Sequence, residues 1–163
     1  MRAAWVDDVD VIEKNTLDSY VGEPGRGHVL HYQLDLGGSF GTFAAGPAEY
    51  WMGDQAYFQA GPILRSLALL GLWPYRWEDE RWQRRRRALV EQYPEMGGFD
   101  AEHFDPRAWH AIVDVPPFER QTARDRYWGA KRVAAYSLDE LRAAIAAGRY
   151  RPAAADHLLR TLW

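Results

Sequence analysis

Three polar side chains in the first part of the chain have the types and the spacing of a site for a divalent cation. Asp10 precedes Asn15 by five residues, and Asp35 follows Asn15 by twenty. Asp35 ends an apolar-rich stretch in "HVLHYQLDLGGSFG" and is followed closely by Gly37 and Gly38. Carboxylate and amide oxygens are hard ligands that suit Mg²⁺, with water and phosphate completing its coordination shell. The simpler alternative is that Asp and Gly are turn residues here, and that Asn15 begins a strand through local hydrogen bonds.

A β-hairpin would bring these side chains to one place. The segment "GEPGRG" has Pro followed by Gly, which suits the two central positions of a type II turn, and both flanking segments favour strands. We therefore predict a hairpin over about 16–34. Asn15 lies ten residues before Gly25 and Asp35 ten residues after it, so the two side chains face each other at the open end. Paired strands lie about 5 Å apart, so both side chains can reach one ion, with Asp10 in the loop that leads into the first strand.

The order of these residues resembles the catalytic centre of the protein-kinase-like superfamily, with "DVIEKN" as the catalytic loop and "LDLGG" as the D-F-G segment. In such kinases the loop Asp takes the hydroxyl proton, while the Asn five residues later and the D-F-G Asp hold the metal ions. The resemblance implies that Asp10 is the base and that Asn15 and Asp35 hold Mg²⁺ with bound ATP. It also implies that Gly37 and Gly38 let the backbone turn beside phosphate.

Three positions depart from the kinase pattern. Asp8 stands two residues before Asp10, where His or Tyr is common. Ile12 stands two residues after it, where kinases have Lys, and Leu36 replaces the Phe of D-F-G. Many small-molecule kinases accept other apolar residues at this last position.

A second resemblance covers nearly the whole chain. The segments "KNTLDSYV", "HVLHYQLDLGGSFGT", "RDRYWGAKRVAAYS" and "LRAAIAAGRY" are similar to the C-terminal part of an uncharacterised bacterial protein family. Its members are several hundred residues long and carry N-T-L-D, then H-Y-L-I-D-F-G, then Y-W-G-A-K. This resemblance implies that the chain is a fragment that lacks an upstream lobe. That lobe, or a partner chain, would supply the Gly-rich phosphate loop and the nucleotide-pairing Lys.

Composition narrows the class of protein. The chain has 163 residues, 47% hydrophobic residues and a formal net charge of −3, so we expect a folded domain without nucleic acid or a membrane as a partner. The absence of cysteine excludes a disulfide framework, a thiolate zinc site and a Cys nucleophile. The acidic N-terminus has no apolar signal core, and the longest apolar stretch is far shorter than a membrane span, so we predict a cytoplasmic protein.

We predict a mixed α+β fold with one β-hairpin packed on a mostly helical body, resembling a kinase-like C-terminal lobe. The chain is expected to be a single domain over 1–163. The hairpin and a Gly-rich loop occupy 1–54, a buried helix and an irregular segment occupy 55–122, and 123–163 is helical.

Local patterns place the helices. Pro62 favours a helix start, and that helix is expected to end at Gly71 and to be buried, because most of its residues are apolar. Ser137 and Glu140 form a capping box for a later helix. The segment 94–118 reads as an extended loop held by aromatic residues: Phe99, Phe104, Trp109 and Phe118.

Two further motifs have simpler interpretations. The run Arg84–Arg87 lies among acidic residues in an acidic chain, so we interpret it as a solvated helix face with internal ion pairs rather than a nucleic-acid patch. Ser39 in "GGSFG" matches the pattern of a nucleophile elbow, but the residues after it are a poor helix start and no triad is evident.

Two functions from different classes remain. The first is the metal- and phosphate-binding lobe of a kinase-like phosphotransferase, incomplete as a catalyst alone because positioning and charge neutralisation do most of the work in phosphoryl transfer. Its partners would be a nucleotide and an unknown acceptor. The second is a non-catalytic structural or interaction domain in which the hairpin is only scaffold. The aromatic content, 14% of residues, also makes self-association an expectation.

Overall fold

The computed structural model describes residues 2–102, 104–115 and 120–163, so the predicted role of Phe118 lies outside the described residues. The described chain has a mixed α+β fold, which confirms the predicted class. Its small sheets are antiparallel pairs of strands: β1 (Thr16–Val21) with β2 (His28–Gln33), and β3 (Thr42–Phe43) with β4 (Gly46–Pro47). The α-helices are α1 (Arg2–Trp5), α2 (Ala60–Ala68), α3 (Glu80–Gln92), α5 (Ala123–Val133), α6 (Leu138–Ala147) and α7 (Pro152–Leu162).

The predicted hairpin is confirmed in position and turn type. In its register Thr16 pairs with Gln33. The turn is closed by a 2.9 Å hydrogen bond from the backbone N–H of Arg26 to the carbonyl of Glu23. Gly25 has a φ of 81°, the left-handed value that the third position of a type II turn requires. The Pro-Gly turn therefore fixes the register of the two strands. The register then determines which residues lie at the open end of the hairpin.

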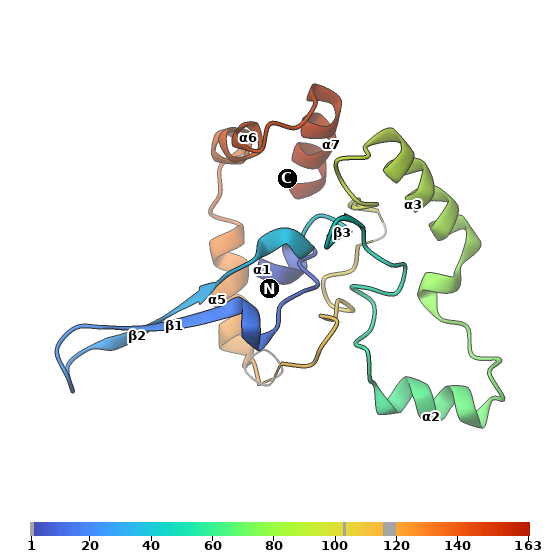
Figure 1. The fold of residues 1–163 in the computed structure, drawn as a ribbon, viewed down its shortest axis with the longest axis horizontal. Helices are drawn as coiled ribbons and strands as arrows, with labels where there is room; N and C mark the ends of the chain where they lie inside the picture. Colours follow the sequence, from blue (N-terminus) through green and yellow to red (C-terminus); the bar gives the residue numbers. More distant parts are fainter. Residues whose placement is uncertain (1, 103, 116–119) are drawn as a thin grey trace.

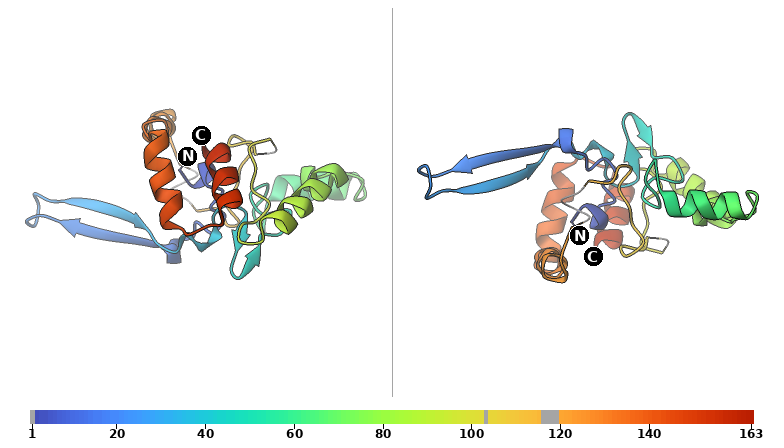
Figure 2. Two further views of the ribbon diagram at one scale, coloured as in Figure 1. Left: turned by 90° about the horizontal axis from the view of Figure 1, so that it is seen from above. Right: turned by 90° about the horizontal axis from the view of Figure 1, so that it is seen from below.

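The hairpin projects from the helical body instead of packing on it (Figure 1), and this part of the fold prediction is wrong. All residues of β2 are exposed, and the two views in Figure 2 show the same projection. One face of the hairpin carries the apolar side chains of Leu17, Leu30 and Tyr32, whose exposed fractions are 51%, 37% and 47%. A two-stranded ribbon with an uncovered apolar face is marginally stable by itself, so this face favours a partner.

The C-terminal helices begin as their sequence predicts. Ser137 and Glu140 form the expected capping box at α6, and Thr122 and Asp125 form a second one at α5. Pro152 is the first residue of α7, where a missing N–H is harmless. These ends satisfy backbone donors that would otherwise lack partners in the first turn.

Most of the buried apolar residues of the described chain gather in two clusters. The larger one joins the end of α3 and the following loop to α6 and α7, through Tyr93, Met96, Phe99, Ile145, Ala154 and Leu158. The smaller one lies under the loop before the hairpin and consists of Val9, Ala48, Met52 and Ile112. Val9 is fully buried, and its backbone N–H and carbonyl bond to Gly38 and Ile112. The second cluster therefore anchors the loop that carries Asp10.

Helix α2 is exposed, which contradicts the prediction that it is buried. It begins at Ala60, two residues before Pro62, and none of its residues is buried. Leu64 and Leu67 are 64% and 68% exposed. The helix ends at Ala68, shortly before the predicted end at Gly71, whose φ is 79° and whose N–H bonds to the carbonyl of Ser66 at 2.8 Å. The described residues do not cover the apolar side chains of α2, so we expect another molecule or segment to cover them.

The arginine run on α3 is only partly solvated, so that interpretation needs correction. Arg84 pairs with Glu80 at 2.9 Å within the helix, as expected. Arg86, in contrast, is 7% exposed and donates to the backbone carbonyls of Ala48 and Glu49 at 2.8 and 3.2 Å. Burial lowers the pKa of its guanidinium from the usual value, and the group also lies over the rings of Tyr50 and Trp82.

Candidate functional site

Asn15 and Asp10 are held together by two hydrogen bonds. The amide nitrogen Nδ2 of Asn15 donates to the backbone carbonyl of Asp10 at 2.9 Å and to its carboxylate oxygen Oδ2 at 3.0 Å. A short 3₁₀ turn, Glu13–Asn15, delivers the amide. Both bonds use the nitrogen, so the amide oxygen Oδ1 is the atom with which Asn15 would bind a cation. The structure thus brings these two predicted residues into contact.

The hairpin register places Asp35 at the same open end as Asn15, but it sets Leu34, and not Asp35 as predicted, directly opposite Asn15. The backbone N–H of Leu34 donates to the carbonyl of Asn15 at 2.7 Å, which places Asp35 one residue beyond the end of the ladder. Asp35 adopts a left-handed conformation with φ 50° and ψ 77°, and its side chain accepts a bond from the N–H of Gly37 at 3.2 Å. Left-handed backbone is uncommon outside glycine and, where it occurs, is frequent at functional sites.

The two glycines after Asp35 have different roles. Gly38 is buried, and its carbonyl accepts a 3.0 Å bond from Val9. A Cβ at this position would lie 2.9 Å from the Cβ of Asp10 and 3.1 Å from its nitrogen, so only glycine lets the turn lie against the Asp10 loop. A Cβ on Gly37 would lie 3.1 Å from the Asp35 carboxylate. The sequence predicted a tight turn here, and the structure adds its contact with Asp10.

Asp8 is a further member of this group that the sequence analysis treated only as a departure from the kinase pattern. Its side chain is fully buried, with Oδ2 accepting a hydrogen bond from the amide of Gln33 at the end of β2. Its other oxygen, Oδ1, is buried and has no hydrogen-bonding partner in the described chain. Burial raises the pKa of Asp8 to about 6, and the nearby charges of Asp10 and Asp35 raise it further against hydrogen bonds that lower it. A carboxyl group two residues before Asp10 is the signal that could have found it.

The donor atoms at this place fit a hard cation. They are two carboxylates and one amide oxygen, which is the ligand chemistry of Mg²⁺ with water and phosphate in the remaining positions. Within residues 2–102, 104–115 and 120–163, no three His, Cys, Asp or Glu side chains form a group that could hold a metal ion. Asp8, Asp10 and Asp35 therefore do not form a group of three acidic metal ligands. A site with three protein ligands would need the amide oxygen of Asn15 in addition to Asp10 and Asp35.

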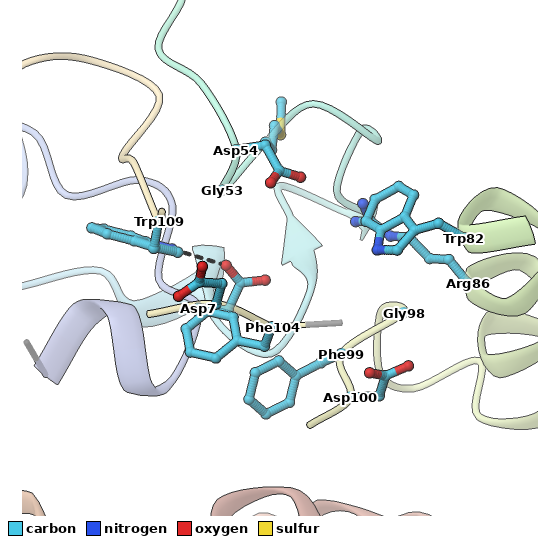
Figure 3. A pocket seen from close by; sticks show the side chains of 12 residues that line it. Asp7, Gly53, Asp54, Trp82, Arg86, Gly98, Phe99, Asp100, Phe104 and Trp109 are labelled. Atoms are coloured by element: carbon cyan, nitrogen blue, oxygen red, sulfur yellow. Dashed lines mark hydrogen bonds between the residues drawn. The ribbon is translucent and has the colours of Figure 1, made fainter. Parts of the chain in front are cut away.

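A second polar region lies around Asp7, in a small cavity lined by Asp7, Asp54 and Arg86 among others (Figure 3). Trp109 donates its indole N–H to Oδ1 of Asp7 at 3.0 Å. Burial raises the pKa of Asp7 to about 7, against the lowering effects of Trp109 and Arg86. The cavity volume is about 50 Å³, whereas pockets for drug-sized ligands occupy roughly 300–1,000 Å³. It is too small for a nucleotide, so we interpret this cluster as structural.

Other sequence candidates take structural roles. Ser39 is buried, and residues 40–59, all of which are described, contain no helix. The strand–turn–helix context of a nucleophile elbow is therefore absent there. His157 stacks on Tyr93 and bonds through Nε2 to the carbonyl of Phe99 at 2.9 Å. Among the described helices, none is both long enough and apolar enough to cross a membrane.

No known family model, curated protein or solved structure matches this chain. Any function must therefore be argued from the geometry of its own residues. That geometry is an Asp–Asn pair bonded through the amide nitrogen, and a left-handed Asp at the same end of the hairpin that opens a Gly-Gly turn.

Proposed function

We propose that this protein is the metal- and phosphate-binding lobe of a kinase-like phosphotransferase. In this proposal Asp10 is the base, Asn15 and Asp35 hold Mg²⁺, and the turn at Gly37 and Gly38 lies beside the phosphates of ATP. The observation that carries the proposal is the pair of hydrogen bonds from Asn15 to Asp10. The nitrogen of the Asn15 amide orients the carboxylate of Asp10, which supports the role of Asp10 as the base. The oxygen of the same amide could then bind the cation, which supports the role of Asn15 as a metal ligand.

The residues of this chain would orient the reacting groups. Asn15 fixes the carboxylate of Asp10, which would accept the proton of the acceptor hydroxyl. Asp8 holds Gln33 two residues before Asp35 and so positions the carboxylate at the end of β2. When bound, Mg²⁺ would supply neutralisation of phosphate charge, which is a main source of catalysis in phosphoryl transfer.

A nucleotide-binding lobe from another region or partner chain completes the proposal. The exposed apolar face of the hairpin, formed by Leu17, Leu30 and Tyr32, begins beside Asn15 and Asp35. A lobe packed on this face would cover apolar surface and approach the proposed ion at the same time. The whole arrangement would then resemble the two lobes of a kinase.

The alternative is a non-catalytic interaction domain. Its support is the exposure of large apolar side chains on both the hairpin and α2, together with the lack of an all-His, Cys, Asp or Glu metal group in the described chain. In this case the bonds of Asn15 and Asp35 would only shape the hairpin base.

Calorimetric titration with Mg²⁺, followed by ATP, separates the two functions. We expect wild type to bind Mg²⁺ and the Asp35→Asn variant to bind it at least about tenfold more weakly, the loss typical of a damaged metal shell. Asparagine is chosen because it tolerates the left-handed backbone of Asp35. The control is Asp18→Asn, which removes the same charge from an exposed position on β1 and should bind like wild type. Equal affinity of Asp35→Asn and wild type, or no binding by either, would refute the proposal.

A further inference from the structure

The surface around α2 carries a group of exposed apolar side chains. It consists of Phe58, Ile63, Leu64, Leu67, Leu70 and Leu72, whose exposed fractions range from 38% to 89%. Ile63 and Leu67 lie four residues apart on the helix, so they share one side of it, and Leu70 lies just beyond the helix end at Ala68. Figure 1 places α2 at the edge of the molecule opposite the hairpin, and both views in Figure 2 agree.

Packing within the described chain does not explain the stability of α2. It has nine residues and buries none of them, whereas isolated helices shorter than about 12–15 residues are marginal in water. A stable α2 therefore requires cover from another molecule or region.

The low charge around this surface is compatible with a second copy of the chain. Arg65 is the only charged residue between positions 55 and 75, and its guanidinium lies 5.4 Å from the ring centroid of Trp73. With one charge on this segment, the repulsion between two copies is limited to the two Arg65 side chains. A helix that binds anionic membrane instead carries several Lys or Arg on its polar face, and this chain has a net charge of −3.

The area of the surface matches a dimer of standard size. Its six side chains expose on the order of 450 Å² of apolar area. A standard interface buries about 800 Å² per partner, of which slightly more than half is apolar. The patch is also within the size range of functional patches on otherwise monomeric proteins.

We propose that the protein forms a two-fold dimer in which α2 packs antiparallel on α2 of a second copy. Two-fold contacts are the commonest in homo-oligomers and place the same residues on both sides. Leu64 and Leu67, near the middle of α2, lie next to the axis and contact their counterparts. This dimer does not depend on the proposed metal site, which lies at the base of the hairpin.

Sedimentation velocity over a concentration series tests the dimer with the full chain. Wild type is expected to approach twice the chain mass of 18.8 kDa, and Leu67→Glu is expected to be a monomer with an unchanged circular dichroism spectrum. The control is Leu17→Glu, which places the same charge on the exposed face of the hairpin and should stay dimeric. A monomeric wild type, a dimeric Leu67→Glu, or a monomer that binds phosphatidylcholine–phosphatidylglycerol vesicles would overturn the proposal.

Cysteine cross-linking gives a second readout that does not depend on disrupting the fold. The chain has no cysteine, so a single introduced thiol can pair only with the same residue of another copy. Leu64→Cys is expected to form a disulfide-linked dimer on mild oxidation, because the residue lies next to the two-fold axis. Lys131→Cys, on exposed α5, should stay uncross-linked. Equal cross-linking of the two variants would contradict the assigned interface.

Discussion

The Asp7→Asn variant is expected to be more stable than wild type at pH 8, by up to about 4 kcal/mol, and equally stable near pH 4. Burial raises the pKa of Asp7 to about 7 in the folded protein, from the ordinary 3.8. The unfolded chain thus releases its proton near pH 4, whereas the folded chain keeps it until about pH 7. Between these values ionisation favours the unfolded state, so the contribution of Asp7 to wild-type stability falls as pH rises and then levels off.

Asparagine is the suitable replacement for two reasons. Its side-chain oxygen can still accept the hydrogen bond from Trp109, and it tolerates the left-handed backbone of Asp7, whose φ is 50°. Urea denaturation of both proteins at pH 4, 6 and 8 measures the difference. The exposed Asp18→Asn serves as control and should follow wild type at each pH. If Asp7→Asn were less stable than wild type at pH 8, Asp7 would instead act as an ionised partner of Arg86.

Gly97→Ala is expected to destabilise the fold by about 3 kcal/mol or more, the upper range for an overpacked position. A Cβ on Gly97 would lie 1.6 Å from the carbonyl oxygen and 2.0 Å from the carbonyl carbon of Gly41. Both are backbone atoms, so no side chain can move aside. The N–H of Gly97 also bonds to the carbonyl of Phe40 at 3.2 Å. The Gly-rich loop after the candidate site therefore packs directly on the loop after α3.

The matched control for this change is Gly61→Ala on α2. A Cβ there meets nothing within 4 Å, and Ala favours helix, so a gain of up to about 1 kcal/mol is expected. Thermal unfolding monitored by circular dichroism compares the two variants with wild type. A Gly97→Ala protein with the stability of wild type would show that the two loops do not touch as described.

The hairpin was predictable because its determinants are local. Pro24 and Gly25 set the turn, and a fixed turn sets which residues lie opposite each other. Counting residues on either side of that turn predicted Asn15 and Asp35 at one open end, and the register differs from that count by one residue, with Leu34 opposite Asn15. The role of Asp8 was not predictable, because its burial depends on contacts with Gln33 and with the Gly38 turn, which no local sequence pattern reveals.

The errors concern features that depend on distant parts of the chain or on partners. The apolar pattern of α2 predicts that the helix is covered, but it cannot tell whether the cover comes from the same chain. Arg86 looked like one more solvated arginine, yet the carbonyls that bind it belong to Ala48 and Glu49, nearly forty residues earlier. Charge patterns describe a helix face, whereas the burial of one member depends on tertiary contacts.

The most direct test of the central claim is to locate a bound divalent cation with paramagnetic Mn²⁺, which shares the oxygen-ligand preference of Mg²⁺. In an NMR titration of the full chain, the amide signals of Asn15, Gly37 and Gly38 should broaden at the lowest Mn²⁺ concentrations, and an excess of Mg²⁺ should restore them. The same signals should resist broadening in Asp35→Asn. If the signals of the acidic loop at Asp100 and Glu102 broadened first, or if no signals were selected, Asp10, Asn15 and Asp35 would not form a cation site.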